Sequence, residues 1–231
     1  KHPRPKFLRN CSAANLVYRF ARLNFASNEN TLLDDGPCKQ FWNLIILRNP
    51  VNRLISHMAH LDQLPYHTEF RVEIMTPETM KIIAPVLVDN YYIRSLMGQD
   101  VFSLKFGKIT QEHMEQAKAR LEQFDTLFVR DDKLFDSAQH ELGLTCEKVF
   151  VKVDQYAGYT DQYNSELERR WSEAQWNKLR STMALDLELY KHAVKLRDLD
   201  RLVFGHQAFQ SMVSLLANKG QGSHACGHLT P

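Results

Sequence analysis

The chain has 231 residues, of which 44% are hydrophobic and 24% charged, and this composition excludes a disordered or fibrous chain. The formal net charge of +2 argues against a general polyanion binder, so we expect no nucleic-acid partner and only a local phosphate site. No apolar run approaches the roughly 18 residues of a membrane helix and no signal peptide is visible, so a membrane anchor is expected only outside this chain.

The first predicted elements are a helix, a loop and a strand. Residues 12–25 have a helical pattern, the polar stretch 27–40 is typical of a loop, and the aliphatic run 43–47 predicts a buried strand. At Asn49 and Pro50 the hydrophobic pattern changes from that of a strand to that of a helix. Asn49 is a favourable N-cap, and Pro50 suits the first helical position because its missing N–H costs nothing there.

The helix that follows, over about 50–63, is predicted to be amphipathic. Its apolar face is expected to pack on the core and consists of Val51, Leu54, Ile55, Met58 and Leu61. Its polar face carries Arg53, Ser56, His57 and His60. This polar face is the first candidate for a functional surface.

The rest of the chain alternates helices and strands before becoming helical. A helical region is predicted over 77–97, bent at Pro85 and stopped at Gly98. It is followed by a helix from Thr110 to Phe124, a strand over 126–130, a helix over 133–142 and a strand over 149–153. From Ser165 onward the pattern is almost entirely helical, and Ser172 and Gln175 have the spacing of a capping box.

This order of elements predicts the fold class. Short strands that alternate with helices indicate an α/β layered fold with a mainly parallel sheet and a helical C-terminal part. No composition change marks a linker, so we expect a single domain over 1–218. The Gly- and His-rich tail over 219–231 is expected to be disordered.

The cysteines and histidines do not predict a metal site. Four cysteines lie far apart without CxxC spacing, which leaves disulfides open: Cys11, Cys38, Cys146 and Cys226. In the tail, His224, Cys226 and His228 alternate, but they lack a fixed scaffold and a fourth ligand. We therefore expect no metal cofactor. Asn10 begins a glycosylation sequon, which alone carries little weight.

The segment around Arg48 carries the clearest chemistry. A buried strand delivers Arg48 to the carboxyl edge of the sheet, where α/β proteins usually bind ligands. The next helix begins at once, and a helix N-terminus offers unpaired N–H groups to an anion. Ser56 follows Arg48 by eight residues, on the polar side of that helix. A guanidinium and a hydroxyl so placed can hold one phosphate; the alternative is a surface arginine and a chance spacing.

Residues 47–57 (Leu-Arg-Asn-Pro-Val-Asn-Arg-Leu-Ile-Ser-His) resemble the 3'-phosphate-binding motif of sulfotransferases. In that motif an Arg after a strand and a Ser eight residues later hold the 3'-phosphate of 3'-phosphoadenosine 5'-phosphosulfate (PAPS). Three further segments are similar to Golgi carbohydrate sulfotransferases and their algal or microbial relatives: 90–98, 124–144 and 185–193. The similarity spans about residues 43–196.

The resemblance implies a P-loop-kinase-like three-layer fold and sulfuryl transfer from PAPS to an acceptor hydroxyl or amine. A carbohydrate hydroxyl, and hence a glycan partner, is favoured, with the Golgi lumen as location and the cytoplasm as the alternative. Arg48 and Ser56 would bind the 3'-phosphate. Arg94 would face the cofactor or acceptor, or else form a structural ion pair. Tyr91, Tyr92 and the segment 185–193 are expected in core packing instead.

One hallmark of the family has no counterpart here. The family carries Pro-Lys-x-Gly-Ser/Thr-Ser/Thr near its N-terminus, whose N–H groups and Lys hold the 5'-phosphosulfate. The first glycine, Gly36 in Asp-Gly-Pro, has neither that Lys nor the hydroxyls. We therefore expect a domain that lacks its N-terminal strand–loop–helix and is inactive on its own. The alternatives are an inactive module that binds nucleotide bisphosphate or glycan, and a helical interaction protein with a coincidental motif.

The general base is also unassigned. Sulfuryl transfer needs a group that takes the proton of the acceptor. His57 is the candidate catalytic residue, with His60 beside it, because both lie on the polar helix face with Ser56. The alternative is that both are ordinary solvent-facing or hydrogen-bonded histidines.

Overall fold

The computed structural model of the chain describes residues 31–32, 36–39, 41, 43–130 and 154–203. Several predictions concern residues outside these ranges, namely the helices over 12–25 and 133–142, the strand over 149–153, the tail over 219–231, and Asn10.

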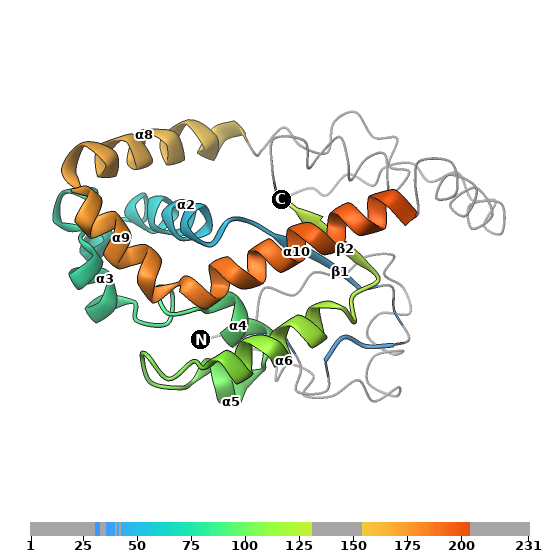
Figure 1. The fold of residues 1–231 in the computed structure, drawn as a ribbon. Coiled ribbons are helices and arrows are strands. Elements are labelled where there is room, and N and C mark those ends of the chain that lie inside the picture. The colour runs from blue at the N-terminus through green and yellow to red at the C-terminus, as the bar shows by residue number, and fades with distance from the viewer. Residues whose placement is uncertain (1–30, 33–35, 40, 42, 131–153, 204–231) are drawn as a thin grey trace, which may run out of the picture.

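Among the described residues, two parallel strands form a sheet (Figure 1). β1 (Leu44–Leu47) pairs with β2 (Thr126–Val129) in a register that runs from Leu44 opposite Thr126 to Leu47 opposite Val129. All four side chains of β2 are buried, as expected of an apolar run inside an α/β protein. Both strands were predicted, and both are confirmed.

The helix after β1 also matches its prediction. α2 (Pro50–Asp62) starts at Asn49, whose Oδ1 accepts hydrogen bonds from Val51 N at 3.0 Å and Asn52 N at 3.3 Å. Pro50 occupies the first turn, where it displaces no backbone hydrogen bond. The predicted apolar face is buried at Leu54, Ile55 and Met58, with Val51 and Leu61 partly buried against the core.

The helical region predicted over 77–97 is two helices instead of one bent helix. Two short 3₁₀ turns, η1 (Thr68–Phe70) and η2 (Val72–Ile74), precede α3 (Pro77–Ile83) and α4 (Tyr91–Leu96). α3 ends before Pro85, because a residue that precedes proline is forced out of the helical conformation. Asn90 then adopts φ 51°, a left-handed conformation that asparagine tolerates, and sets the direction of α4.

The remaining described helices are α5 (Gln99–Phe102), α6 (Gln111–Leu121), α8 (Asp154–Arg170), α9 (Glu173–Thr182) and α10 (Ala184–Val203). Thr110 caps α6, and the capping box of Ser172 and Gln175 begins α9, as predicted. The C-terminal helical region starts earlier than the predicted Ser165, since α8 already begins at Asp154. Tyr163 and Leu167, four residues apart, form its buried stripe.

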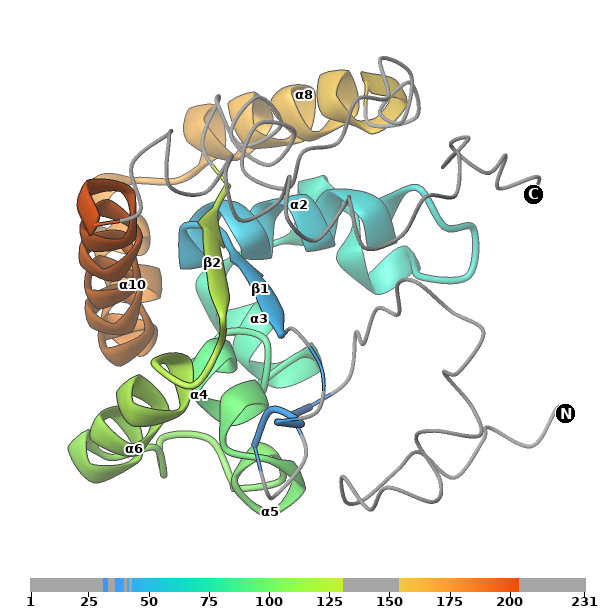
Figure 2. The same ribbon diagram turned by 90° about the vertical axis from the view of Figure 1, so that its right-hand side faces the viewer.

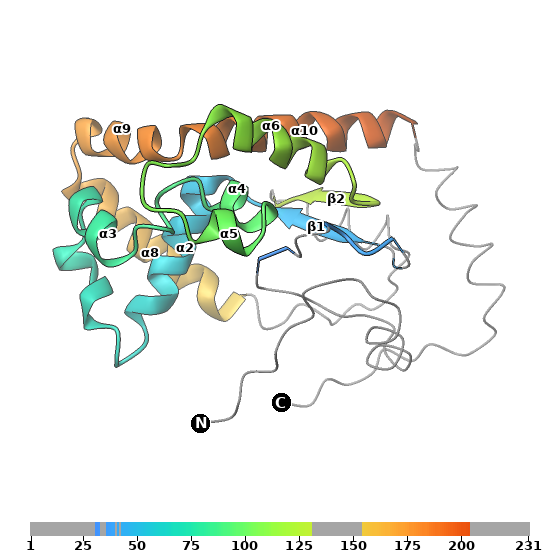
Figure 3. The same ribbon diagram turned by 90° about the horizontal axis from the view of Figure 1, so that it is seen from below.

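The helices pack in two clusters around the sheet. Side chains of α2, α3, α8 and α9 form one apolar cluster, and those of β1, β2, α4, α6 and α10 form the other. Figure 3 shows α6 and α10 on one side of the strands, and Figure 2 shows α8 running along α2. The described chain is thus an α/β protein with mostly helical content and a small parallel sheet. Among its described helices, none combines the length and apolar character of a membrane span.

Candidate functional site

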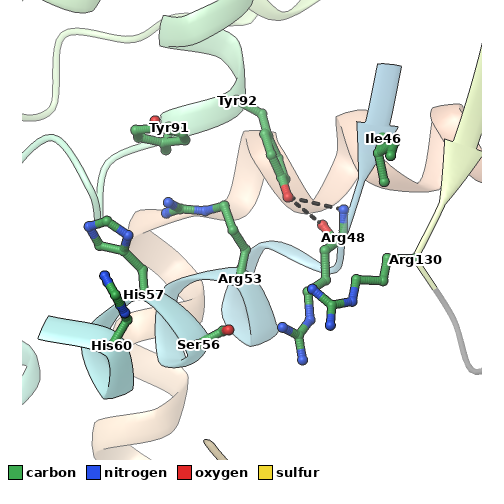
Figure 4. Close-up of a pocket in the computed structure, with 9 residues that line it drawn as sticks. All are labelled: Ile46, Arg48, Arg53, Ser56, His57, His60, Tyr91, Tyr92 and Arg130. Carbon is green, nitrogen blue, oxygen red and sulfur yellow. Dashed lines mark hydrogen bonds between the residues drawn. The ribbon is translucent and has the colours of Figure 1, made fainter. Parts of the chain in front are cut away.

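A pocket opens where the two strands end. Its volume is about 470 Å³, and it is lined by Ile46, Arg48, Arg53, Ser56, His57, His60, Tyr91, Tyr92 and Arg130 (Figure 4). Three of these side chains are guanidiniums and two are imidazoles, whereas none of the described lining residues is acidic. In a chain with a net charge of only +2, this is a local concentration of positive charge suited to an anion.

Arg48 directly follows β1 and is held by its backbone. Its N–H donates to Tyr92 Oη at 3.0 Å, and Tyr92 Oη in turn donates to Arg48 O at 2.9 Å. Its guanidinium makes no hydrogen bond or ion pair with any described residue. Burial, and next the charge of Arg130, lower the pKa of Arg48, but a guanidinium stays protonated. The main chain is therefore fixed while the charged end points into the pocket.

Ser56 lies on α2 and lines the same pocket as Arg48. Figure 4 shows its hydroxyl on the side of α2 where the guanidiniums of Arg48 and Arg130 lie. No hydrogen bond joins this hydroxyl to another described residue, so it is available to donate to a ligand. The structure thus brings together the two residues that the sequence predicted as phosphate ligands.

The N-terminus of α2 contributes less than predicted. The unpaired N–H groups expected there include those of Val51 and Asn52, but both already donate to Asn49 Oδ1. The next N–H, of Arg53, donates to Asn49 O at 2.8 Å. An anion in the pocket must therefore be bound mainly by side chains, with the helix adding its partial positive charge at most.

Behind Tyr92, two helices cap one another. The Asp186 carboxylate, in the first turn of α10, accepts from Tyr92 N at 2.8 Å and Ile93 N at 3.0 Å. Asp186 N in turn donates to Asn90 Oδ1 at 3.0 Å. Burial raises the pKa of Asp186 to about 6, although the two N–H donors act in the opposite direction. The segments 90–98 and 185–193 therefore meet, and together they position Tyr92 under Arg48.

Arg94 is fully buried, with 0% of its surface exposed, and lies outside the pocket. It forms an ion pair with Asp89. Its guanidinium donates to five main-chain oxygens, namely Asp89 O at 2.7 Å, Val101 O at 3.3 Å, Phe102 O at 3.0 Å, Leu104 O at 2.7 Å and Lys105 O at 3.2 Å. Its donors are thus consumed within the protein. The interpretation of Arg94 as a cofactor contact does not fit this geometry, whereas the structural ion pair does.

His57 and His60 both line the pocket, next to Arg53. Burial, then the charge of Arg53 and then His60, lower the pKa of His57 below its ordinary value. A lowered pKa favours the neutral form of the ring, which is the form that can accept a proton. This property suits a general base but does not assign one. The predicted polar face of α2 therefore does face the pocket.

The sequence did not place Tyr91, Tyr92 or Arg130 in the site. Tyr91 and Tyr92 were expected in core packing. Tyr92 does pack against the apolar cluster of β1, β2, α4, α6 and α10, but both tyrosines also line the pocket. The Tyr91 ring stacks under the Arg53 guanidinium at 4.0 Å. Arg53 also donates to Leu87 O at 2.8 Å. Arg130 was not considered at all. Its signal in the sequence is its place as the last residue of the strand predicted over 126–130, just as Arg48 stands at the end of the strand predicted over 43–47.

The described residues contain no group of three or more His, Cys, Asp or Glu side chains that could hold a metal ion. The tail residues His224, Cys226 and His228 lie outside the described ranges. No protein-family model, curated protein or solved structure matches the chain. The function of the pocket must therefore be argued from its own chemistry.

Proposed function

We propose that this pocket is the 3'-phosphate half of a sulfotransferase donor site. In this proposal Arg48 and Ser56 hold the 3'-phosphate of PAPS, whose sulfuryl group goes to an acceptor hydroxyl, with a carbohydrate as the favoured acceptor. The P-loop-kinase-like three-layer fold belongs to the same proposal. Its described part is the parallel pair β1–β2 with helices packed against it.

The single observation that carries the proposal is the meeting of Arg48 and Ser56 in one pocket that has no described acidic lining. A guanidinium binds a phosphate through two parallel N–H···O bonds, and the hydroxyl can donate to a third oxygen. The Tyr92 hydroxyl fixes the main chain of Arg48, because it accepts a hydrogen bond from Arg48 N–H and donates one to Arg48 C=O. A preorganised site loses less entropy when the ligand binds.

A location in the Golgi lumen is part of the proposal, with the cytoplasm as the alternative. Cys38 is disulfide-bonded. Disulfides persist in oxidising compartments and are rare in the cytoplasm, so this bond favours the lumen. Labelling of the native chain with a thiol reagent tests the bond, because Cys38 should react only after reduction.

Two isomeric ligands test the phosphate site directly. Adenosine 3'-monophosphate and adenosine 5'-monophosphate have the same composition and differ only in where the phosphate sits. We expect the folded chain to prefer the 3' isomer in calorimetric titration, and Arg48→Ala to remove that preference. Charge-assisted hydrogen bonds contribute about 1.5–3 kcal/mol each, so the variant should weaken the 3' isomer by at least about tenfold.

Ser56→Ala provides a graded control. The substitution removes one neutral hydrogen-bond donor, worth about 1 kcal/mol. We therefore expect the affinity for adenosine 3'-monophosphate to weaken only a few-fold. Equal affinity for the two isomers in wild-type protein, in a sample shown to be folded by circular dichroism, would contradict the proposal and favour a helical interaction protein.

A second candidate is a module that binds nucleotide or glycan without catalysis. It is favoured by the sequence itself, which contains no Pro-Lys-x-Gly-Ser/Thr-Ser/Thr loop for the 5'-phosphosulfate. We expect the 231-residue chain to show no sulfuryl transfer from PAPS to a mixture of glycans. Robust transfer by the isolated chain would overturn this expectation.

A further inference from the structure

We propose that Arg130 is a second guanidinium of the phosphate site, and that the pair Arg48–Arg130 selects a dianionic phosphate monoester over a singly charged ester. This inference rests on the proposed function of Arg48 and Ser56, and it adds a specificity-determining residue to that site.

The register of the sheet places the two arginines together. Leu47 lies opposite Val129 in the parallel pair, and Arg130 N donates to Leu47 O at 2.6 Å. The pairing therefore continues to the point where Arg48 and Arg130 leave their strands. Neighbouring strands lie about 4.8 Å apart, so the two side chains start side by side. Figure 4 shows the two side chains converging, so that both guanidiniums lie near one another on the side of the pocket where Ser56 lies.

The electrostatics of the pair favour an anion between them. After burial, the charge of Arg130 is the largest influence on the pKa of Arg48 and lowers it, whereas Tyr92 and Asp161 on α8 each act in the opposite direction with a smaller effect. Neither guanidinium forms an ion pair with a described residue. Like charges at neighbouring strand positions repel one another. An anion that bridges them replaces this repulsion with two attractions.

The charge of the ligand follows from this arrangement. A phosphate monoester carries about −1.5 to −2 charges at pH 7, and one arginine balances only part of it. Two arginines match the dianion and offer bidentate contacts from two directions, with the Ser56 hydroxyl as a neutral third donor. A phosphodiester carries a single charge and has fewer free oxygens, so it should bind less well. A sulfate ester keeps as many free oxygens as the phosphate monoester but carries a single charge, so it should also bind less well.

A pair of related nucleotides probes this selectivity. Adenosine 3'-monophosphate is the dianionic monoester, and adenosine 2',3'-cyclic monophosphate is a singly charged diester at nearly the same position. We would titrate the full chain and its Arg130→Gln variant with both ligands and with inorganic pyrophosphate at fixed ionic strength. Arg130→Gln should weaken the monoester by at least about tenfold. It should weaken the cyclic diester much less, so that the preference shrinks.

Arg169→Gln is the matched control. Arg169 lies on the exposed surface of α8 in an ion pair with Glu166, so its loss changes the net charge equally without touching the pocket. We expect it to alter the affinity by less than about twofold, because exposed charges at a distance are screened. Arg130 is exposed, and equal melting temperatures of the variants would verify that folding is preserved.

The possible results separate the two proposals. If Arg48→Gln weakens the monoester and Arg130→Gln behaves like Arg169→Gln, the role of Arg130 is wrong and the proposed function stands. If pyrophosphate binds and requires both arginines, but the 3' and 5' nucleotides bind equally, the arginine pair stands and the sulfotransferase site falls. If wild-type protein binds none of these probes, both proposals are overturned.

Discussion

Two arginines that the sequence suggests as ligand contacts have opposite surroundings in this molecule. Arg94 is completely buried. Its guanidinium forms an ion pair with Asp89 and donates hydrogen bonds to main-chain oxygens of Phe102 and Leu104. Arg48 is half-buried, its main chain is fixed by Tyr92, and its guanidinium points into a pocket without a described partner. The comparison teaches that a guanidinium can bind a ligand only where the protein leaves its donors unused. The hydrogen bonds and the ion pair of Arg94 stabilise the fold, whereas the guanidinium of Arg48 faces the pocket.

The largest expected effect is on stability when Arg94 is removed. Arg94→Met leaves the buried Asp89 carboxylate without its ion-pair partner, and we expect the free energy of unfolding to fall by about 3–5 kcal/mol. Urea denaturation measures this change. The affinity of the folded protein for nucleotide, after correction for the fraction that is unfolded, should stay the same.

Arg48→Met is the matched substitution on the other side of the comparison. It removes a cation that has no described partner and that is repelled by Arg130, so stability should change by less than about 0.5 kcal/mol. Binding of adenosine 3'-monophosphate should be lost. A large destabilisation by Arg48→Met with a small one by Arg94→Met would reverse the assignment of the two roles.

A smaller effect, with a defined pH dependence, is expected at Asp186. With a native pKa of about 6, Asp186 still binds a proton between about pH 4 and pH 6, where the unfolded chain has released it. The native state therefore binds more protons in this window, and stability falls as the pH rises through it. The difference between the pKa of Asp186 in the native and in the unfolded state corresponds to about 3 kcal/mol in the free energy of unfolding.

Asp186→Asn isolates this contribution, because an amide does not titrate there. The stability of wild-type protein relative to the variant should decrease from pH 4 to pH 7, as measured by denaturation at each pH. The variant also turns an NH₂ toward Tyr92 N or Ile93 N, which costs about 1–3 kcal/mol at every pH. A difference that stays constant with pH would contradict the raised pKa.

The smallest effect concerns the pocket itself. His57 should titrate below its ordinary value of about 6.5, as measured by NMR of its ring protons. His60→Gln should raise this pKa, since it removes one of the three causes of the lowering. His113→Gln, on α6, serves as the control and should leave it unchanged. An unperturbed His57 would remove the argument that this ring is poised to accept a proton.

The parts of the fold with local causes were predictable. The strand before Arg48 follows from its apolar run, and the start of α2 follows from Asn49 and Pro50. The break near Pro85 was underestimated, because a proline that bends a long helix and one that ends a short helix have the same local signature.

The candidate site was predictable only in part. Arg48 and Ser56 were found because one strand and one helix carry both. Tyr92 was missed because its role depends on a contact across 44 residues of chain. Arg130 was missed because the pairing partner of β1 cannot be read from either strand alone. Such contacts depend on tertiary structure, which no local pattern encodes.

The mutual capping of α4 and α10 gives the site a place in the order of folding. Tyr92 is held by Asp186, which lies 94 positions later in the chain. During synthesis the chain emerges from its N-terminal end, so β1 and α2 exist long before the residue that secures the support of Arg48. Such distant contacts form slowly, because a long loop must close first. Arg48 is therefore locked in place only when the first turn of α10 docks, and a nascent chain that ends before residue 184 carries the motif without a finished site.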